Sequence, residues 1–155
     1  MDASYLIFRV GRDTFALPAQ QVREVVARPA LTSPPGLPKI IAGFINLGGK
    51  SFAVLDLPCM FEQQSRLDLN QHVILLRHQA IACLVDRVLD FGLLSDLRPL
   101  PEGHLFNAWA KNLSTYQNQD VVLLDSEALL LEEEKLRLEH FQKLAQTRLQ
   151  AWHNG

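Results

Sequence analysis

One stretch of the chain has residue types that resemble a phosphate-binding loop. Gly43 is followed by an apolar run and then by Gly49, Lys50 and Ser51. A phosphate loop places four residues between its first glycine and the glycine before lysine, and it presents the amino end of a helix to the phosphates. Here five residues intervene, and the apolar residues 52–55 predict a strand instead of a helix. The stretch therefore predicts a tight hairpin turn and no nucleotide site.

The other reactive side chains form no catalytic or metal-binding pattern. No pair of histidines has ligand spacing on a predicted element, and the serines lack a Gly-x-Ser-x-Gly turn. Cys59 and Cys83 match no metal or redox motif, so two reduced thiols in a core are expected. Asp56, Asp86 and Asp125 end or interrupt apolar strands, where a turn or capping role is favoured over acid–base catalysis. We predict no enzyme activity, no metal and no cofactor.

The composition is that of a folded protein without a surface for nucleic acid. Of 155 residues, 48% are hydrophobic and 21% are charged, so a buried core is expected. The formal net charge of -2 gives no basic face for nucleic acid or anionic lipid. No apolar run approaches membrane-spanning length, and the first residues lack the basic and apolar regions of a signal peptide. A cytoplasmic location is therefore expected.

Short apolar stretches separated by turn residues predict a mainly β fold. The predicted strands cover residues 5–10, 14–17, 22–26, 42–47, 51–55, 73–76, 81–85, 88–94, 108–113 and 121–124. Residues 29–38 contain four prolines, which excludes a helix or a central strand there and predicts an ordered loop. The polar residues 62–71 mark the expected seam between two lobes.

The strand pattern of the first half recurs in the second half. The matching positions are 22 and 85, 46 and 112, and 56 and 125, at offsets of 63, 66 and 69 residues. A drifting period of this kind favours two related β lobes over a solenoid, which needs three or more units. Short antiparallel strands in each half would close as small barrels, because closure removes exposed strand edges. Chance similarity between short apolar strands is the alternative.

Residues 126–152 predict a C-terminal helix, because they lack glycine and proline and are rich in good helix formers. Ser126 is the expected cap. One apolar stripe at helical spacing packs on the chain's own barrels or binds a partner, and it consists of Leu138, Phe141, Ala145, Leu149 and Trp152.

Taken in order, these stretches resemble the CheW-like family of chemotaxis coupling proteins. The matching segments are residues 22–25, the proline-rich loop, residues 43–50, 54–57, 85–88 and 122–125, so that the resemblance runs from residue 5 to residue 131. It implies a single CheW-like domain over residues 1–155 with two SH3-like five-stranded barrels. The first lobe is expected at residues 15–70 and the second at 72–125, with strands in residues 5–14 bridging them.

The resemblance also implies a non-catalytic adaptor without cofactors. One surface would meet the regulatory domain of a CheA-type histidine kinase, and another would meet the hairpin tip of a chemoreceptor. Membrane association would then arise only through receptors, and nucleic acid is not a partner. The residues that the resemblance assigns to partner binding are Val22, Glu24, Val25, Gly43, Asn46, Leu47, Gly48, Gly49, Lys50 and Val85. For the apolar residues among them a core role, and for the glycines a role in backbone geometry, is the alternative.

One position departs from the family pattern. The family carries arginine between Leu47 and Gly49, where this chain has Gly48. An exposed arginine would make charge-assisted hydrogen bonds that glycine cannot make. Either Lys50 takes part of that role, or the chain is a divergent module in a pilus-motility or phototaxis array that binds kinase but not receptor. A small-ligand-binding β barrel is a third possibility, which the lack of convergent polar residues in the sequence disfavours.

Overall fold

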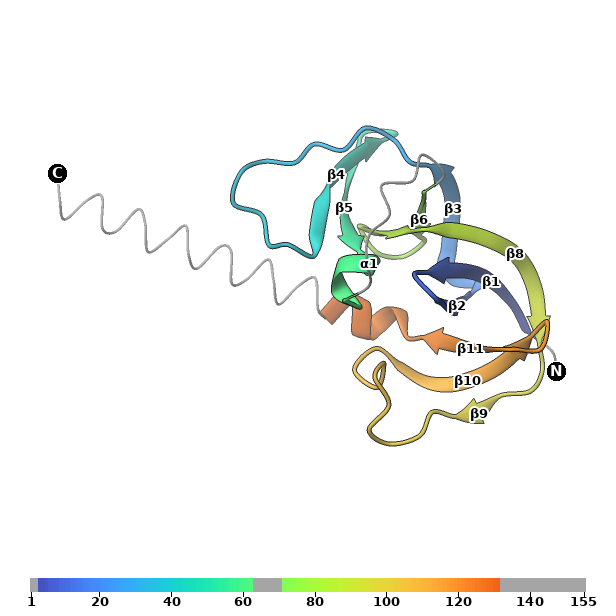
Figure 1. The fold of residues 1–155 in the computed structure, drawn as a ribbon. Helices are drawn as coiled ribbons and strands as arrows, with labels where there is room; N and C mark the ends of the chain where they lie inside the picture. Colours follow the sequence, from blue (N-terminus) through green and yellow to red (C-terminus); the bar gives the residue numbers. More distant parts are fainter. Residues whose placement is uncertain (1–2, 63–70, 132–155) are drawn as a thin grey trace, which may run out of the picture.

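The computed structural model describes residues 3–62 and 71–131, and these form a mainly β protein (Figure 1). The elements are β1 (Ala3–Val10), β2 (Asp13–Pro18), η1 (Ala19–Gln21), β3 (Val22–Ala27), β4 (Ile41–Leu47), β5 (Lys50–Asp56), α1 (Leu57–Met60), β6 (His72–Leu76), β7 (Ile81–Val85), β8 (Arg87–Leu94), β9 (Arg98–Pro99), β10 (Ala110–Tyr116) and β11 (Gln119–Leu124). A helix begins after β11 and covers residues 126–131. The rest of the predicted C-terminal helix, with its apolar stripe, lies outside the described residues.

The strands form two sheets, which confirms the predicted mainly β, two-lobed architecture. The five-stranded sheet has the order β3-β6-β7-β5-β4, and the six-stranded sheet has the order β8-β1-β2-β11-β10-β9. In Figure 1, β3 to β6 lie in the upper part of the molecule, β9 and β10 lie in the lower part, and β1 and β2 lie between them. The prolines predicted to exclude regular structure occupy the connection between β3 and β4, which forms an isolated bridge from Thr32 to Phe44.

The two sheets repeat one topology. Strands β3, β6, β7, β5 and β4 correspond in order to β8, β1, β2, β11 and β10. In both sheets the successive neighbours are antiparallel, antiparallel, parallel and antiparallel. The predicted internal repeat is therefore present as a repeat of strand pairing.

The observed pairing corrects the expected lobe boundaries. Strands β6 and β7 belong to the five-stranded sheet, although they fall within residues 72–125, and β1 and β2 pair within the six-stranded sheet. All residues of β7 are buried, because its alternate side chains pack into two apolar clusters, Ile81, Cys83 and Val85 into one and Ala82 and Leu84 into the other. The sequence of a fully buried strand is only a run of apolar residues, and such a run does not show which strands pair with it. The polar stretch at residues 62–71 therefore connects two strands of one sheet.

The register of the repeat also differs from the expected one. Ile41 pairs with Leu55 in the first sheet as Ala110 pairs with Leu124 in the second, an offset of 69 residues. The same offset relates Asp56 to Asp125, as expected. Position 46 then corresponds to position 115, so its expected match to position 112 is wrong by three residues. The similarity of the two Asn-Leu pairs is accidental.

One hydrophobic core joins the two sheets. Phe8 and Phe15 of the six-stranded sheet belong to the same buried cluster as Leu55 and Ile74 of the five-stranded sheet. The ring of Phe61, just after α1, lies 4.9 Å from that of Phe15, centroid to centroid. Removing one such buried aromatic side chain typically costs about 3–5 kcal/mol. The shared core therefore fixes the position of one sheet against the other.

Aspartates cap both helices that follow the last strand of each hairpin. The Asp56 carboxylate accepts a hydrogen bond from the Cys59 N–H at 3.1 Å, and the Asp125 carboxylate accepts one from the Glu127 N–H at 3.0 Å. These bonds confirm the predicted capping role of the two aspartates and show that Asp125, not Ser126, caps the second helix. Asp86 accepts a hydrogen bond from the Gly11 N–H, which joins the β1–β2 turn to the β7–β8 connection.

Candidate docking surface

Strand β3 carries three of the residues that the family resemblance assigned to partner binding. Val22 pairs with Leu76 and Glu24 pairs with Leu75, so a β-bulge leaves Arg23 outside the regular pairing. The bulge allows both Arg23 and Glu24 to face solvent, while Val22 is buried. Glu24 makes no ion pair with any residue in the described part of the chain. Glu24 is therefore available to a partner, and Val22 belongs to the core.

Two cations link β3 to the β4–β5 hairpin across one aromatic ring. The guanidinium carbon of Arg23 lies 5.7 Å from the centroid of the Phe52 ring, and the Lys50 ammonium lies 5.3 Å from it. Cation–π contacts of this kind contribute about 0.5–1 kcal/mol at exposed sites. Phe52 itself is fully buried, so the two cationic side chains shield its ring.

The β4–β5 hairpin closes through a two-residue turn. Gly48 and Gly49 have φ angles of 58° and 77°, and a pair of positive φ angles defines a type I′ turn. The turn exposes Asn46 and Lys50, which flank it, and both glycines. Leu47 is half-buried against the second apolar cluster, which includes Ile45 and Phe52. Leu47 therefore has a packing role, whereas its neighbours in the turn are exposed.

Gly43 supports the backbone and does not offer a contact surface. It is buried, and a Cβ at this position would lie 2.7 Å from the Thr32 carbonyl oxygen and 2.7 Å from Ser33 Oγ. Its φ of 154° is also one that other residues rarely adopt. Only glycine lets the β3–β4 connection pack this closely on β4.

Val85 is the last residue of β7 and lies at the seam between the two sheets. It is on the side of the end of β3 that is opposite to Arg23. It is fully buried and pairs with His72, which in turn pairs with Ala27 at the end of β3. The His72 Nδ1 atom accepts a hydrogen bond of 3.3 Å from the Val88 N–H, which joins β6 to β8. Val25 and Val88 are both half-buried against the shared core. Val85 therefore has a packing role in the shared core and is not available to a partner.

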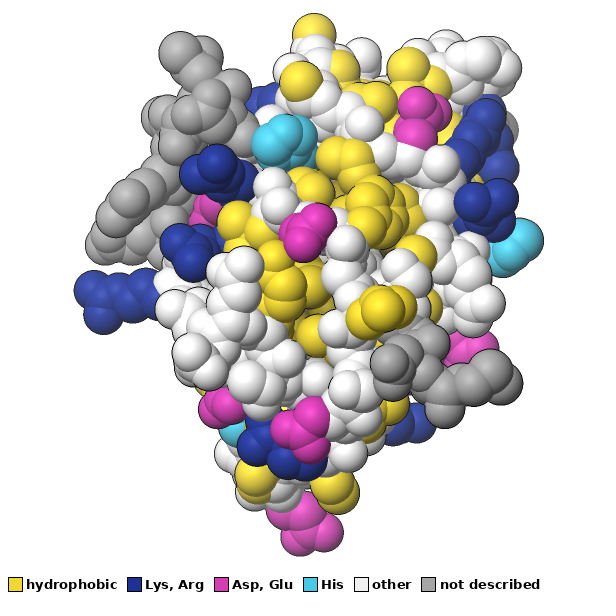
Figure 2. All heavy atoms as spheres, turned by 90° about the vertical axis from the view of Figure 1, so that its right-hand side faces the viewer, with side chains coloured by type: hydrophobic (Ala, Val, Ile, Leu, Met, Phe, Trp, Pro, Cys, Tyr) yellow, Lys and Arg dark blue, Asp and Glu magenta, His cyan; other side chains and the backbone are white. Residues whose placement is uncertain are grey.

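Strand β8 adds two residues that the sequence did not single out. Phe91 and Leu93 are 56% and 67% exposed, and β8 is the edge strand of the six-stranded sheet. Figure 2 shows apolar side chains gathered across the middle of the face on which β8 and β3 lie, with acidic and basic side chains around and among them. The signal was present in the sequence as an apolar strand at residues 88–94, but an apolar run does not reveal which faces are uncovered.

Within residues 3–62 and 71–131 no group of three or more histidine, cysteine and acidic side chains could hold a metal ion. No helix in the same residues is long and apolar enough to cross a membrane. The features of the site are those of a docking surface: an apolar edge strand, a bulged neighbour with an exposed carboxylate, and a cation-bearing hairpin.

Comparison with known proteins identifies the family of this two-sheet β protein. The family model described as "CheW-like domain" matches residues 4–134. The chain belongs to the CheW-like domain family.

Curated relatives agree with this assignment, and a solved structure has a similar fold. The chain is 28% identical over 140 residues to the probable chemotaxis protein CheW of Rhizobium etli, covering 86% of this chain and 90% of the relative. It is 29% identical over 146 residues to the chemotaxis protein CheW of Klebsiella aerogenes, covering 90% of this chain and 88% of the relative. The crystal structure of the scaffolding protein TtCheW from Thermoanaerobacter tengcongensis matches with a TM-score of 0.76 at 23% identity, covering 81% of this chain and 90% of that one.

Proposed function

We propose that this protein is a non-catalytic cytoplasmic adaptor that couples chemoreceptors to a CheA-type histidine kinase. Family membership supports the adaptor role, and the names of the curated relatives support chemotaxis as the process. In this role the protein performs no bond chemistry. It holds a receptor and the regulatory domain of the kinase at fixed positions, so that a change in the receptor reaches the kinase.

The receptor binds at the coupling face, which we define as Glu24, Val25, Val88, Phe91 and Leu93. The observation that carries this proposal is the exposure of Phe91 and Leu93 on the edge strand β8, while Val25 and Val88 pack half-buried against the shared core. Contiguous exposed apolar side chains with a charged margin are typical of protein-binding sites. A helical hairpin offers apolar anchors at helical spacing, which suits such a face. The kinase regulatory domain binds elsewhere, so that both partners are held together.

Charge introduced at the coupling face tests this proposal. Phe91→Asp places a carboxylate against the receptor's apolar anchors, and we expect binding of a receptor signalling fragment to weaken by about 2 kcal/mol or more, as for interface hot spots. Leu105→Asp is the matched control, since Leu105 is 68% exposed but lies outside the coupling face. Titration calorimetry on both variants measures the effect. Equal receptor affinity for Phe91→Asp and wild type would show that the receptor does not bind at this face.

The divergent turn favours a second candidate function. Gly48 offers no side chain where the family carries arginine, and the Lys50 ammonium lies over the Phe52 ring. A chain without that cation would bind the kinase regulatory domain but not the receptor, as a spacer in a pilus-motility or phototaxis array. Kinase binding together with undetectable receptor binding by the wild-type protein would support this alternative.

A further inference from the structure

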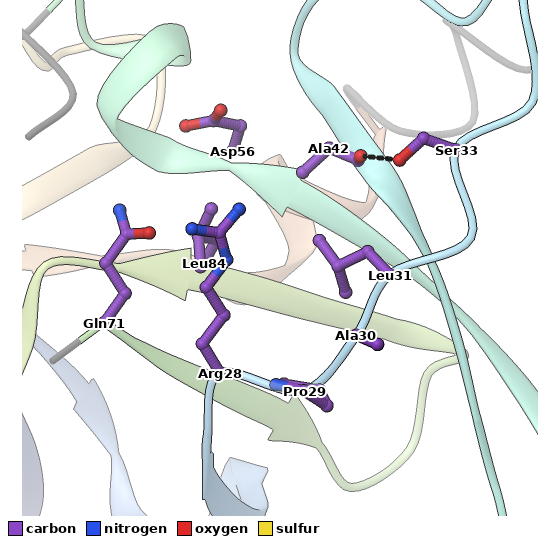
Figure 3. Close-up of a pocket in the computed structure, with 9 residues that line it drawn as sticks. All are labelled: Arg28, Pro29, Ala30, Leu31, Ser33, Ala42, Asp56, Gln71 and Leu84. Atoms are coloured by element: carbon purple, nitrogen blue, oxygen red, sulfur yellow. Dashed lines mark hydrogen bonds between the residues drawn. The ribbon is translucent and has the colours of Figure 1, made fainter. Parts of the chain in front are cut away.

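A pocket opens at one end of the five-stranded sheet. Its volume is about 540 Å³, and it lies between the connection that follows β3 and the ends of β4, β5 and β7 (Figure 3). Pockets for small molecules in proteins have volumes of about 300–1,000 Å³. The polar side chains that line it include Arg28, Asp56 and Gln71, and Leu31, Ala42 and Leu84 form an apolar wall. Such convergence of polar groups was not evident from the sequence.

Gln71 supplies a buried hydrogen-bond donor without an acceptor among the described residues. The residue is 2% exposed, and within residues 3–62 and 71–131 its Nε2 atom has no hydrogen-bond partner. Its backbone is fixed, because the Gln71 carbonyl accepts a hydrogen bond of 3.0 Å from the Arg28 N–H. A buried donor left unpaired is unfavourable, and in a pocket wall it favours a ligand that brings an acceptor.

Arg28 and Asp56 place opposite charges on the same pocket. The Arg28 and Gln71 side chains extend in the same direction, toward the end of the pocket at which Asp56 lies (Figure 3). Arg28 and Asp56 both line the pocket, and among the described residues they form no ion pair with each other. Burial raises the pKa of the Asp56 carboxyl, and the Cys59 N–H and the Arg28 charge lower this pKa only in part. A cationic group in the pocket would further stabilise the Asp56 carboxylate.

We propose that this pocket binds a free α-amino acid as its zwitterion. The ligand carboxylate accepts hydrogen bonds from the Arg28 guanidinium and Gln71 Nε2, and the ligand ammonium donates to the Asp56 carboxylate. An apolar ligand side chain lies against Leu31, Ala42 and Leu84. The site is separate from the coupling face, and the proposal goes beyond the adaptor function.

Titration calorimetry with the full-length protein and the proteinogenic α-amino acids, each at millimolar concentration, tests the ligand class. We expect at least one amino acid with an apolar side chain to saturate a single site. The best ligand is then compared with two analogues, the carboxylic acid that lacks its amino group and the amine that lacks its carboxylate. Each charged hydrogen bond lost should weaken binding by about ten- to a hundredfold. Binding of no amino acid, or equal binding of both analogues and the amino acid, overturns the proposal.

Substitutions in the pocket assign the contacts. Arg28→Gln and Gln71→Leu should each weaken amino-acid binding by about tenfold or more, since each removes a donor to the carboxylate. Asp56→Asn keeps a capping side chain for α1 and should abolish the preference for the amino acid over its des-amino analogue. Arg87→Gln, on β8, is the matched control for the charge change. Arg28 is exposed, so its replacement should not unfold the protein. If Arg28→Gln melts normally and still binds the amino acid like wild type, the proposed site is contradicted.

Discussion

Gly43 illustrates how a residue that belongs to a family pattern can act through the backbone alone. A methyl group at this position would meet the Thr32 carbonyl and Ser33 Oγ at 2.7 Å, so the connection after β3 would have to move. We expect Gly43→Ala to lower the free energy of unfolding by about 2–3 kcal/mol, as overpacked sites do. Gly36→Ala is the control, since Gly36 also has a positive φ but no atom lies within 4 Å of the position that its methyl group would take. Equal urea midpoints for the two variants would contradict the close-packing account.

Glu24 is the charged residue of the coupling face, and it is exposed directly after the bulged residue Arg23. We expect Glu24→Lys to weaken binding of a receptor fragment by about 1–2 kcal/mol, a cost within the range of interface hot spots. Its effect on folding should stay within about 0.5 kcal/mol, since Glu24 is exposed. Glu102→Lys, an exposed charge reversal in the loop before β10, is the control. Receptor titrations and thermal melts measure the two effects. Normal receptor binding by a stable Glu24→Lys protein would show that the receptor does not bind at this face.

Cys83 should make stability fall at alkaline pH. Burial raises the pKa of its thiol to about 12 from an ordinary value of 9.0. The unfolded chain therefore releases this proton from pH 9 upward while the folded chain retains it, so the stabilising contribution is complete below pH 9 and is lost between pH 9 and 12. The expected slope is about 1.4 kcal/mol per pH unit in that window. Urea unfolding of wild type and Cys83→Ala across this range should give a steeper decline for wild type, and parallel curves would refute the assignment.

At the scale of elements, the turn of the β10–β11 hairpin carries a long side chain at the position that corresponds to Gly48 in the repeated topology. Gln117 and Asn118 occupy the turn of the β10–β11 hairpin with φ angles of 50° and 64°, as Gly48 and Gly49 do in β4–β5. No atom lies within 4 Å of a Cβ placed on Gly48. We expect Gly48→Arg to fold at a cost of about 1–2 kcal/mol from its left-handed backbone.

Receptor binding by the Gly48→Arg protein should be unchanged or tighter than receptor binding by wild type, because an exposed arginine in the turn can donate charge-assisted hydrogen bonds. Gly48→Asn is the matched control, since asparagine tolerates the same backbone without a long cation. Thermal melts measure the cost of the left-handed backbone, and receptor titrations measure the contribution of the arginine side chain to binding. Loss of receptor binding by Gly48→Arg but not by Gly48→Asn would mean that the arginine obstructs docking.

The strands could be predicted from the sequence because each is a short apolar run with turn residues around it. Residues 22–26 were predicted for β3, which covers Val22–Ala27. The predicted strand at 108–113 fell short of β10, Ala110–Tyr116, because its turn is formed by Gln117 and Asn118 without any glycine. Turn chemistry at such positions depends on tertiary context, which a single sequence does not display.

Strand partners and surface exposure could not be predicted in the same way. The parallel pairs β5–β7 and β2–β11 join segments far apart in the chain, and nothing in an apolar run specifies its neighbour. The candidate site was therefore only partly anticipated. Glu24 and Lys50 were expected, and both are exposed. Phe91 and Leu93 on β8 emerged only once β8 was seen to be an edge strand.

At the scale of the whole molecule, the shared core makes the two sheets one body with distinct outer surfaces. Phe15 of β2 contacts both Phe61 and Phe106, at ring-centroid distances of 4.9 Å and 5.0 Å. Because these rings come from both halves of the chain, they pack the two sheets against each other in one core. An adaptor that holds two partners at fixed positions needs this property.

The most direct test of the adaptor role is whether one protein holds both partners at once. Light scattering after size-exclusion chromatography would compare the receptor signalling fragment and the kinase regulatory domain, with and without this protein. We expect the two partners to elute separately in its absence and together with it as a ternary complex. Phe91→Asp should release the receptor fragment and retain the kinase domain. Competition of the two partners for the protein, or the absence of binding to either, would contradict the adaptor account.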